Sequence, residues 1–283
     1  PGRQSRTRPA HPRHEDVAGQ IERRPGPLSH TAASSSALRP RALAECAPLW
    51  DKLSMAVSSS VRILESYWQE HPAWFGRPYG EYLHLGANQE MLRIALGKTA
   101  LSAVSRVLDV GTALGGNARW LAALHGCTVD GVDRFRPAIV CARQLAKAQG
   151  LGELCRFTVQ EGAAIPFSDH LFDVAVTADD ESMWPEVSRV LKPGGVLVGS
   201  AVALEGREAF ERAAAEAGFH TAFLLDVTAY ALAFYRAKEQ EAKLLVEAGL
   251  MPASDLQSLQ MYTVDLYEAG GASHVLFRMT TER

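Results

Sequence analysis

Two aspartates and a group of small residues have the types and spacing needed to bind a nucleotide-like cofactor. Gly111, Ala113 and Gly115 alternate in the segment VLDVGTALGG, which begins with an apolar run. Small residues in a turn let the backbone approach a ligand closely. Asp133 ends the segment TVDGVD 22 residues after Gly111, where a carboxylate can accept hydrogen bonds from the two hydroxyls of a ribose. The pattern therefore predicts a cofactor that contains a ribose.

Two features of the same loop bear on which cofactor it serves. The dinucleotide template G-x-G-x-x-G is not met, because Ala113 stands at the position of its second glycine. Asp109, two residues before Gly111, would repel a pyrophosphate but would attract a cationic amino group. The loop therefore favours S-adenosylmethionine over a nicotinamide dinucleotide, and it makes a dehydrogenase the less favoured alternative.

Strand and helix patterns alternate along the chain and must position these residues. Helical periodicity begins near residue 46, and apolar runs bounded by turn residues predict strands further on. The predicted strands cover 106–111, 128–133, 155–160, 172–177, 196–204, 221–227 and 274–281. The predicted helices cover 46–68, 88–101, 117–126, 136–150, 206–219 and 230–249. This alternation predicts an α/β fold, a doubly wound and mostly parallel sheet with helices on both faces.

Four segments in this order and spacing resemble the class I S-adenosylmethionine-dependent methyltransferases. They are VLDVGTALGG, VDGVD, EGAAIPFSDHLFDVAVT and SRVLKPGGVLVGS, and the likeness covers about residues 88–205. YLHLG at 82–86 resembles a signature of small-molecule members such as the sarcosine/dimethylglycine N-methyltransferases and the tocopherol C-methyltransferases. The resemblance implies a seven-stranded, Rossmann-like methyltransferase sheet, an N-terminal helical lid and S-adenosyl-L-methionine as cofactor.

The resemblance also implies roles for individual residues at the methionine end of the cofactor. Gly111, Ala113 and Gly115 would pass under the methionine part, and Asp109 would contact its amino group directly or through water. Thr177 and Ala178, just past the fourth strand, would face the sulfonium.

At the adenosine end, the resemblance implies that Asp133 takes both ribose hydroxyls and that Arg134 lies over the adenine. Glu161, with the backbone of Gly162 and Ala163, would read the edge of the adenine. Two purely structural readings stay open: Asp133 as a cap at the end of a strand, and Glu161 as a surface acid.

The candidate catalytic residues are Tyr82, His84 and Glu181. Tyr82 and His84 belong to the expected lid, and Glu181 lies in the acidic segment ADDESMW, which could hold a cationic amine or form a solvated turn. The predicted function is methyl transfer to a small-molecule acceptor, with an amine nitrogen favoured over carbon or oxygen.

The interval between the fourth and fifth strands departs from the family pattern. Only 17 residues separate Phe172 from Arg189, so we expect the helix in this interval to be reduced to a turn. The alternative function is therefore a protein that keeps the methyltransferase fold and binds the cofactor but has no transferase activity.

The composition of the chain suggests that it has three parts, and its charge argues against one class of partner. Residues 1–45 hold eight Arg, four acids and six of the fourteen prolines, which predicts a flexible tail, although the same composition resembles an organelle transit peptide. Residues 46–100 would form the helices and lid, and residues 101–283 the cofactor-binding domain. The part after residue 45 has a net charge of −7, which argues against a nucleic-acid partner.

Cysteine usage and hydropathy bear on the compartment. No apolar run reaches the roughly 18 residues that a membrane span needs. The four cysteines show no metal-ligand spacing, so we expect free thiols, no metal site and a cytoplasmic location, with organelle targeting by the tail left open. The oligomeric state is not predicted.

Overall fold

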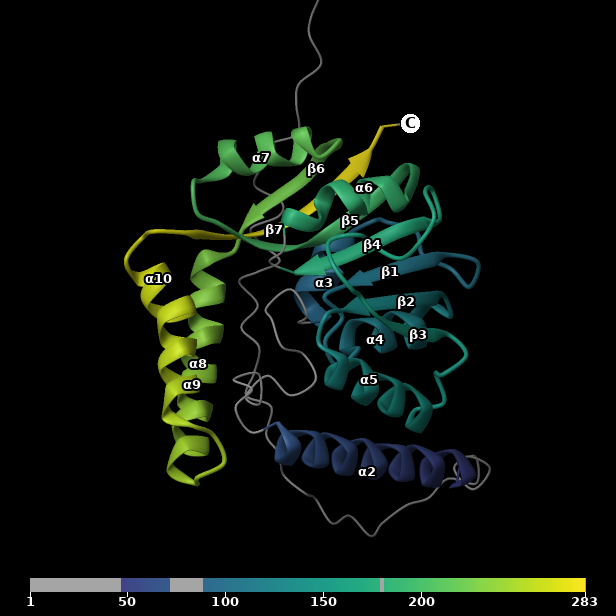
Figure 1. The fold of residues 1–283 in the computed structure, drawn as a ribbon, viewed down its shortest axis with the longest axis vertical. Coiled ribbons are helices and arrows are strands. Elements are labelled where there is room, and N and C mark those ends of the chain that lie inside the picture. The colour runs from purple at the N-terminus through teal and green to yellow at the C-terminus, as the bar shows by residue number, and fades with distance from the viewer. Residues whose placement is uncertain (1–46, 72–88, 179–180, 283) are drawn as a thin grey trace, which may run out of the picture. The chain divides into compact units, whose positions relative to one another are not determined.

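The computed structural model of this protein describes residues 47–71, 89–178 and 181–282 (Figure 1). The chain divides between Ala47 and Pro48, and all the elements of the sheet belong to the unit that begins at Pro48. Within the described residues, no helix is both long enough and apolar enough to cross a membrane.

Seven strands form one sheet in the order β3-β2-β1-β4-β5-β7-β6. The strands are β1 (Arg106–Val110), β2 (Thr128–Asp133), β3 (Cys155–Val159), β4 (Phe172–Ala178), β5 (Leu191–Ala203), β6 (Phe219–Asp226) and β7 (Ser273–Thr281). β7 pairs antiparallel with β5 and β6, and β1 to β5 pair in parallel. The prediction of a doubly wound, mostly parallel seven-stranded sheet is confirmed.

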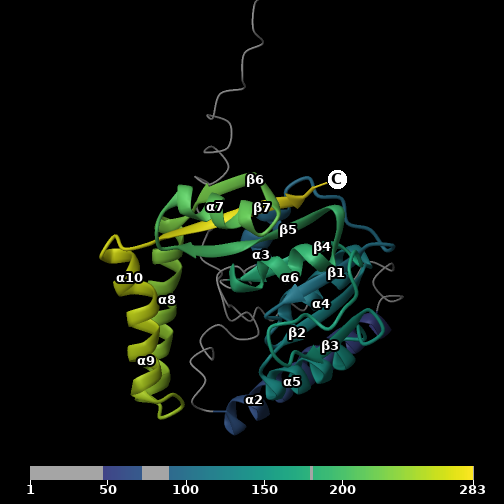
Figure 2. The ribbon, with the colours of Figure 1, turned by 45° about the horizontal axis from the view of Figure 1, so that its top comes forward.

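Helices cover both faces of this sheet (Figures 1 and 2). The helices of the described residues are α2 (Ala47–Glu70), α3 (Gln89–Leu96), α4 (Gly116–His125), α5 (Arg136–Ala148), α6 (Trp184–Val190), α7 (Arg207–Glu216), α8 (Thr228–Glu247), α9 (Ala253–Leu259) and α10 (Asp265–Glu268), with a 3₁₀ turn η4 (Glu181–Met183) and a π-helical segment η5 (Gln260–Val264). Of these, α8, α9 and α10 form a hairpin that projects from the sheet (Figure 1). Alternate residues of β1 point to opposite faces: Val107 packs under α4 and α5, and Leu108 packs under α6.

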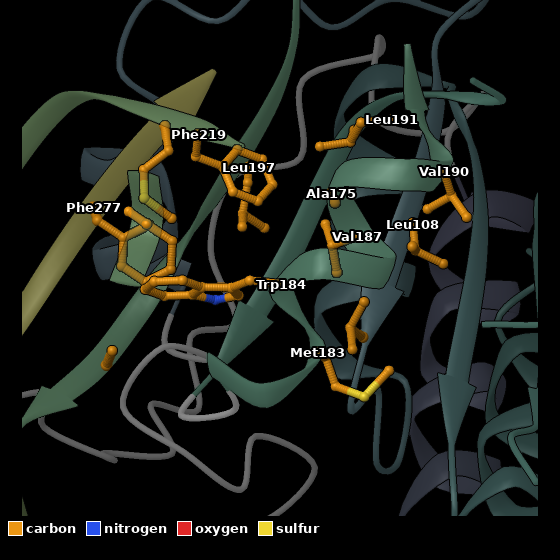
Figure 3. Close-up of a cluster of buried hydrophobic side chains, with 14 of the residues drawn as sticks. Leu108, Ala175, Met183, Trp184, Val187, Val190, Leu191, Leu197, Phe219 and Phe277 are labelled. Atoms are coloured by element: carbon orange, nitrogen blue, oxygen red, sulfur yellow. The ribbon is translucent and has the colours of Figure 1, made fainter. Parts of the chain in front are cut away.

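The core under α6 and α7 is rich in aromatic side chains. Figure 3 shows Trp184 beside Phe277, with Phe219 and Leu197 close by. The rings of Trp184 and Phe277 meet edge to face with centroids 5.6 Å apart. Because Trp184 begins α6, this packing fixes the short helix that follows β4.

The expectation for the interval between β4 and β5 was wrong in its detail. A turn was predicted there, but the structure has η4 followed by the seven-residue helix α6. Pro185 stands in the first turn of α6, where a missing N–H costs nothing, and Val187 and Val190 bury one face of the helix. The helix is short, yet it covers this face of the sheet.

Arg189 ties α6 to the segment that leads into β4. Its guanidinium donates to both carboxylate oxygens of Glu186, to Asp169 Oδ1 at 2.7 Å, and to the carbonyls of Phe167 and Ile165. Through the direct hydrogen bond from Arg189, the pKa of Glu186 lies below its usual value. The arginine of the RVLKPGG motif is thus a structural clamp between two segments that are distant in sequence.

Only the first helix of the helical hairpin between β6 and β7 was predicted from the sequence. α8 was expected, whereas α9, η5 and α10 were not, because residues 253–268 have no clear period. The Tyr267 hydroxyl lies 2.6 Å from Nδ1 of the fully buried His274, which links α10 to β7. The ring of Tyr235 on α8 stacks on Tyr267 with centroids 5.9 Å apart, so one buried cluster joins the hairpin to the sheet.

Candidate functional site

The strand order reverses between β1 and β4, so the loops that leave their carboxyl ends diverge. The chain continues from β1 toward β2 and β3 on one side, and from β4 toward β5 on the other. Such a switch point is where open α/β sheets bind ligands. The cofactor-binding residues predicted from the sequence lie in the last residues of β1, β2 and β4 or in the loops after β1, β2 and β3.

The loop after β1 is built from alternating left-handed residues. Gly111, Ala113 and Gly115 have φ of 68°, 47° and 73°. This geometry explains the glycines of the pattern, and Ala113 adopts it at a cost of roughly 1 kcal/mol. A Cβ on Gly115 would lie 2.6 Å from the Phe157 ring, whereas a Cβ on Gly111 would meet open space. Gly111 is thus the loop glycine that faces outward, and Gly115 is needed for packing.

Asp109 is buried rather than open to the loop. It is 2% exposed, and the Thr112 hydroxyl donates to its Oδ2 at 2.6 Å. Burial raises the pKa of Asp109 to about 7, against the opposing effect of the hydrogen bonds from Thr112 and the Ala118 backbone. The Asp109 carboxyl therefore lies inside the wall of the site and has little surface exposed to solvent.

Asp133 connects the loops after β1 and β2. Its Oδ2 accepts the backbone N–H of Ala113 at 2.9 Å, and its Oδ1 accepts the N–H of Phe135 at 2.8 Å. The Asp133 side chain thus caps the end of β2, which is the purely structural role that the sequence also allowed for it. A carboxylate has about four acceptor sites, so two remain after these bonds for a ribose diol.

The loop after β3 is open to solvent. Glu161 is exposed and pairs with the equally exposed Arg136 at 3.3 Å, while Arg134, Gly162 and Ala163 are exposed as well. Gln160 was missed by the sequence reasoning. It is 6% exposed, its backbone N–H donates to the Asp133 carbonyl at 2.8 Å, and its side-chain amide lies 3.4 Å from the Gly162 carbonyl. Gln160 therefore fixes this loop against the end of β2.

The end of β4 supplies a buried hydroxyl. Thr177 is 2% exposed, and its Oγ1 has no hydrogen-bond partner among the described residues. Ala178 is half-buried, and Glu181, also half-buried, begins η4 and is the next described residue after Ala178. Tyr82 and His84 lie outside the described residues, as do Asp179 and Asp180 of the acidic segment.

A second feature that sequence reasoning missed is the end of α2. Tyr67 and Trp68 are buried in the same cluster as Ala113 and Leu114 of the loop after β1. The i, i+4 spacing of Tyr67 and His71 was a signal that could have drawn attention to this helix face.

The comparison with protein families adds one decisive finding. Residues 107–195, which contain β1 to β4, α6 and the start of β5, match the family described as "Methyltransferase domain". This segment is similar to methyltransferase domains. The strand order of the whole sheet, the antiparallel β7 outside this segment, and the carboxylates at the ends of β1 and β2 agree with that similarity.

The names of curated relatives of this segment include both N-methyltransferases and C-methyltransferases. The methyltransferase GfsG of Streptomyces halstedii is 30% identical over 127 residues, which are 42% of this chain and 46% of that protein. The glycine/sarcosine/dimethylglycine N-methyltransferase of Actinopolyspora halophila is 34% identical over 116 residues, 38% of this chain and 20% of that protein. The 24-methylenesterol C-methyltransferase 2 of Oryza sativa is 35% identical over 100 residues, 33% of this chain and 28% of that protein. The chain thus spans less than half the length of these relatives.

Solved structures share the fold at low sequence identity. The [4+2]-cyclase SpnF superposes with a TM-score of 0.59 at 21% identity, over 69% of this chain and 81% of that one. The geranyl diphosphate C-methyltransferase of Streptomyces coelicolor, solved with S-adenosyl-L-homocysteine, superposes with a TM-score of 0.57 at 17% identity, over 68% and 77%. At such identities the likeness is one of fold.

Proposed function

We propose that this protein binds S-adenosyl-L-methionine at the carboxyl edge of β1 and β2 and transfers its methyl group to a small molecule. The observation that carries the proposal is Asp133. It joins the loops after β1 and β2 through two backbone hydrogen bonds and keeps two acceptor sites. The loop after β1 that it binds contains Gly111, where an added Cβ would meet open space. The match of residues 107–195 to a methyltransferase domain supports the same reading.

The residues at this edge fit the cofactor in chemistry and order. Asp133 would hold the ribose diol, and the exposed backbone of Gly162 and Ala163 would face the adenine, with Arg134 and Glu161 beside them. Gly111 and Ala113 would pass under the methionine part, and Thr177 and Ala178 would bound the sulfonium end. Gly115 supports the loop from behind, because its α-carbon packs against Phe157 and Ala142.

Asp109 would act on the amino group of the cofactor through its charge. A cation placed near a buried carboxyl lowers its pKa, so cofactor binding would release a proton from Asp109 at a pH below 7. Calorimetric titration of S-adenosylhomocysteine in two buffers with different heats of ionisation measures this release. The proposal expects proton release in the wild type and none in Asp109→Asn.

The chemistry needs alignment more than acid–base help. When bound, S-adenosylmethionine supplies a methyl group on a positively charged sulfur, which is a good leaving group. The protein's task is to hold the acceptor in line with that methyl group and to exclude water, and such positioning can contribute about 7–11 kcal/mol. Tyr82 and His84 are the proposed groups that close over the acceptor.

The acceptor is proposed to be a small molecule, with an amine nitrogen favoured. Glu181 comes three residues after the end of β4, and the acidic residues Asp179 and Asp180 precede it in the sequence. Carboxylates at this position would hold a cationic amine and accept its proton before transfer. The names of the relatives include both N- and C-methyltransferases, so the acceptor atom is a matter for experiment.

A cofactor-binding protein without transferase activity is the second candidate. Two observations favour it: Asp109 is buried, and Ala113 stands with φ 47° where the family pattern has a glycine. Incubation with radiolabelled S-adenosylmethionine and a panel of amines, phenols and carbon acids separates the two candidates. Transfer of label to an acceptor, lost in Asp133→Asn, supports the enzyme. Binding of S-adenosylhomocysteine without transfer to any acceptor supports the second candidate.

A further inference from the structure

Helix α2 lies antiparallel along α5, outside the segment that matches the methyltransferase family. Figures 1 and 2 show the two helices side by side. Just after α2, the His71 ring meets the ring of Phe135, which precedes α5, with centroids 5.7 Å apart. Within α2, the Ser60 hydroxyl accepts a hydrogen bond at 3.3 Å from the amide of Gln149, which follows α5. Contacts at both ends of α5 therefore hold α2 in place.

A chain of hydrogen bonds continues from Gln149 to the loop after β1. The amide oxygen of Gln149 accepts Arg119 Nη1 at 2.8 Å, and Arg119 Nη2 donates to the Leu114 carbonyl at 3.3 Å. The Gln149 amide is thus used on both sides, with its nitrogen toward α2 and its oxygen toward α4. Hydrogen bonds through two side chains join Ser60 to the Leu114 carbonyl.

Arg119 is costly at its position and depends on its acceptors. It lies in the first turn of α4 and is 3% exposed. The partial positive charge of a helix N-terminus repels a cation, and a buried charge is tolerated only where it is hydrogen-bonded. The Leu114 carbonyl and the Gln149 amide oxygen are two of the acceptors that hold it. The position of the guanidinium is therefore coupled to both of these groups.

The Leu114 carbonyl belongs to the peptide that sets φ of Gly115. Gly115 has a left-handed φ of 73°, and a glycine adopts positive and negative φ about equally well, so this peptide needs an external contact to fix it. Arg119 supplies that contact from α4. On the other side of Leu114, Asp133 accepts the N–H of the left-handed Ala113 at 2.9 Å. The two left-handed residues of the loop are thus held separately, one from β2 and one through Arg119.

We propose that Arg119 and Gln149 are positioning residues for the cofactor, which transmit the docking of α2 at Ser60 to the shape of the loop after β1. The inference rests on the proposed function, because it assumes that this loop binds S-adenosylmethionine. Neither residue would touch the cofactor. Their effect is preorganisation: a loop already held in its binding shape loses less conformational freedom when the ligand binds. Helix α2, outside residues 107–195, would thereby contribute to cofactor affinity.

The first test is calorimetric titration of the wild type, Gln149→Leu and Gln149→Glu with S-adenosylhomocysteine. Gln149→Leu removes both hydrogen bonds of the amide, and because Gln149 is exposed, the substitution leaves the core intact. Its affinity is expected to fall by about 2- to 30-fold, the range of substitutions that act through a network. Gln149→Glu keeps an oxygen for Arg119 and another for the Ser60 hydroxyl, so it is expected to bind as the wild type does. Gln144→Leu, the same change at an exposed position of α5, is the matched control with unchanged affinity.

A second variant tests whether α2 takes part. Ser60→Ala is expected to weaken binding by itself and to have no further effect in the Gln149→Leu background, because both substitutions break one chain. Coupling between two sites is reciprocal. Saturation with S-adenosylhomocysteine is therefore expected to slow hydrogen exchange at the amides of α2 in the wild type but not in Gln149→Leu, an effect that a merely structural role of Gln149 would not produce.

The outcomes separate this inference from the proposed function. Wild-type affinity in Gln149→Leu, equal affinities of Gln149→Leu and Gln149→Glu, or additive effects of Ser60→Ala and Gln149→Leu would overturn the positioning role alone. Exchange at α2 that does not respond to the ligand in the wild type would overturn it as well. A wild type that does not bind S-adenosylhomocysteine would overturn the proposed function together with the inference.

Discussion

The buried carboxyl of Asp109 makes the stability of this fold fall as the pH rises, over a range where most acidic groups have no effect. Burial raises the pKa of Asp109 from an ordinary 3.8 to about 7. In the unfolded chain the group is ionised above pH 4, whereas in the folded chain it keeps its proton up to about pH 7. The unfolded state then binds fewer protons than the folded state, so the free energy of unfolding decreases with pH between these values.

The size of the effect follows from the length of this pH range. Each pH unit well inside this range changes the free energy of unfolding by ~1.4 kcal/mol, and the slope falls to half at pH 7. The wild type therefore loses about 2 kcal/mol between pH 5 and pH 7 through this group. Asp109→Asn removes the titration and keeps an oxygen that can accept the Thr112 hydroxyl. Urea denaturation at several pH values is expected to show Asp109→Asn gaining about 2 kcal/mol on the wild type from pH 5 to pH 7.

Asp173 provides a matched control on the neighbouring strand. Its burial acts to raise its pKa, but the Lys192 ammonium and the Arg106 backbone N–H outweigh burial and lower the pKa below its usual value. Asp173 is ionised in both states above pH 5, so the difference between Asp173→Asn and wild type is expected to stay constant from pH 5 to pH 7. If the difference in stability between Asp109→Asn and the wild type also stays constant from pH 5 to pH 7, burial does not keep the Asp109 carboxyl protonated. That result would refute the predicted pH dependence.

Three further substitutions test the site and its supports. Asp133→Ala leaves the N–H groups of Ala113 and Phe135 without their acceptor, and urea denaturation without ligand should show a loss of about 1–3 kcal/mol, with full stability contradicting the bridging role. Arg189→Ala should lower the free energy of unfolding by about 2–4 kcal/mol in the same assay. Arg189→Lys should recover only part of that loss, because an ammonium cannot reproduce the planar fork of hydrogen-bond donors of a guanidinium. Equal stability of the two variants would refute the clamp. Ala113→Gly should change the free energy of unfolding by less than ~1 kcal/mol, because relief of the left-handed backbone offsets the lost packing of the methyl group. Ala113→Val should lower it by more than ~2 kcal/mol. Equal effects of the two substitutions would count against a strained backbone at this position.

The sequence predicted those parts of the fold that depend on local pattern. Apolar runs ending at Val110 and Asp133 specify buried parallel strands, because both faces of such strands are covered. The position of Asp133 relative to Gly111 then follows from the length of one strand–helix–strand unit. The switch point and the carboxylate at the end of β2 could therefore be predicted without coordinates.

What could not be predicted depends on contacts between distant segments. Gly115 is needed because Phe157, more than 40 residues later, packs on its α-carbon. The burial of Asp109 depends on the Thr112 hydroxyl and on α4 closing over it, which no spacing reveals. The contact of His71 with Phe135 joins segments that share no local signal. Such features follow from tertiary packing, which local sequence patterns do not indicate.

The measurement that tests the central claim most directly is calorimetric titration of the wild type with S-adenosylhomocysteine, with NADH as the comparison ligand. The account predicts saturable binding of one S-adenosylhomocysteine per chain, strongly reduced in Asp133→Asn, and no binding of NADH. An absence of S-adenosylhomocysteine binding, or equal affinity in the wild type and Asp133→Asn, would contradict the proposed cofactor site at the carboxyl edge of β1 and β2.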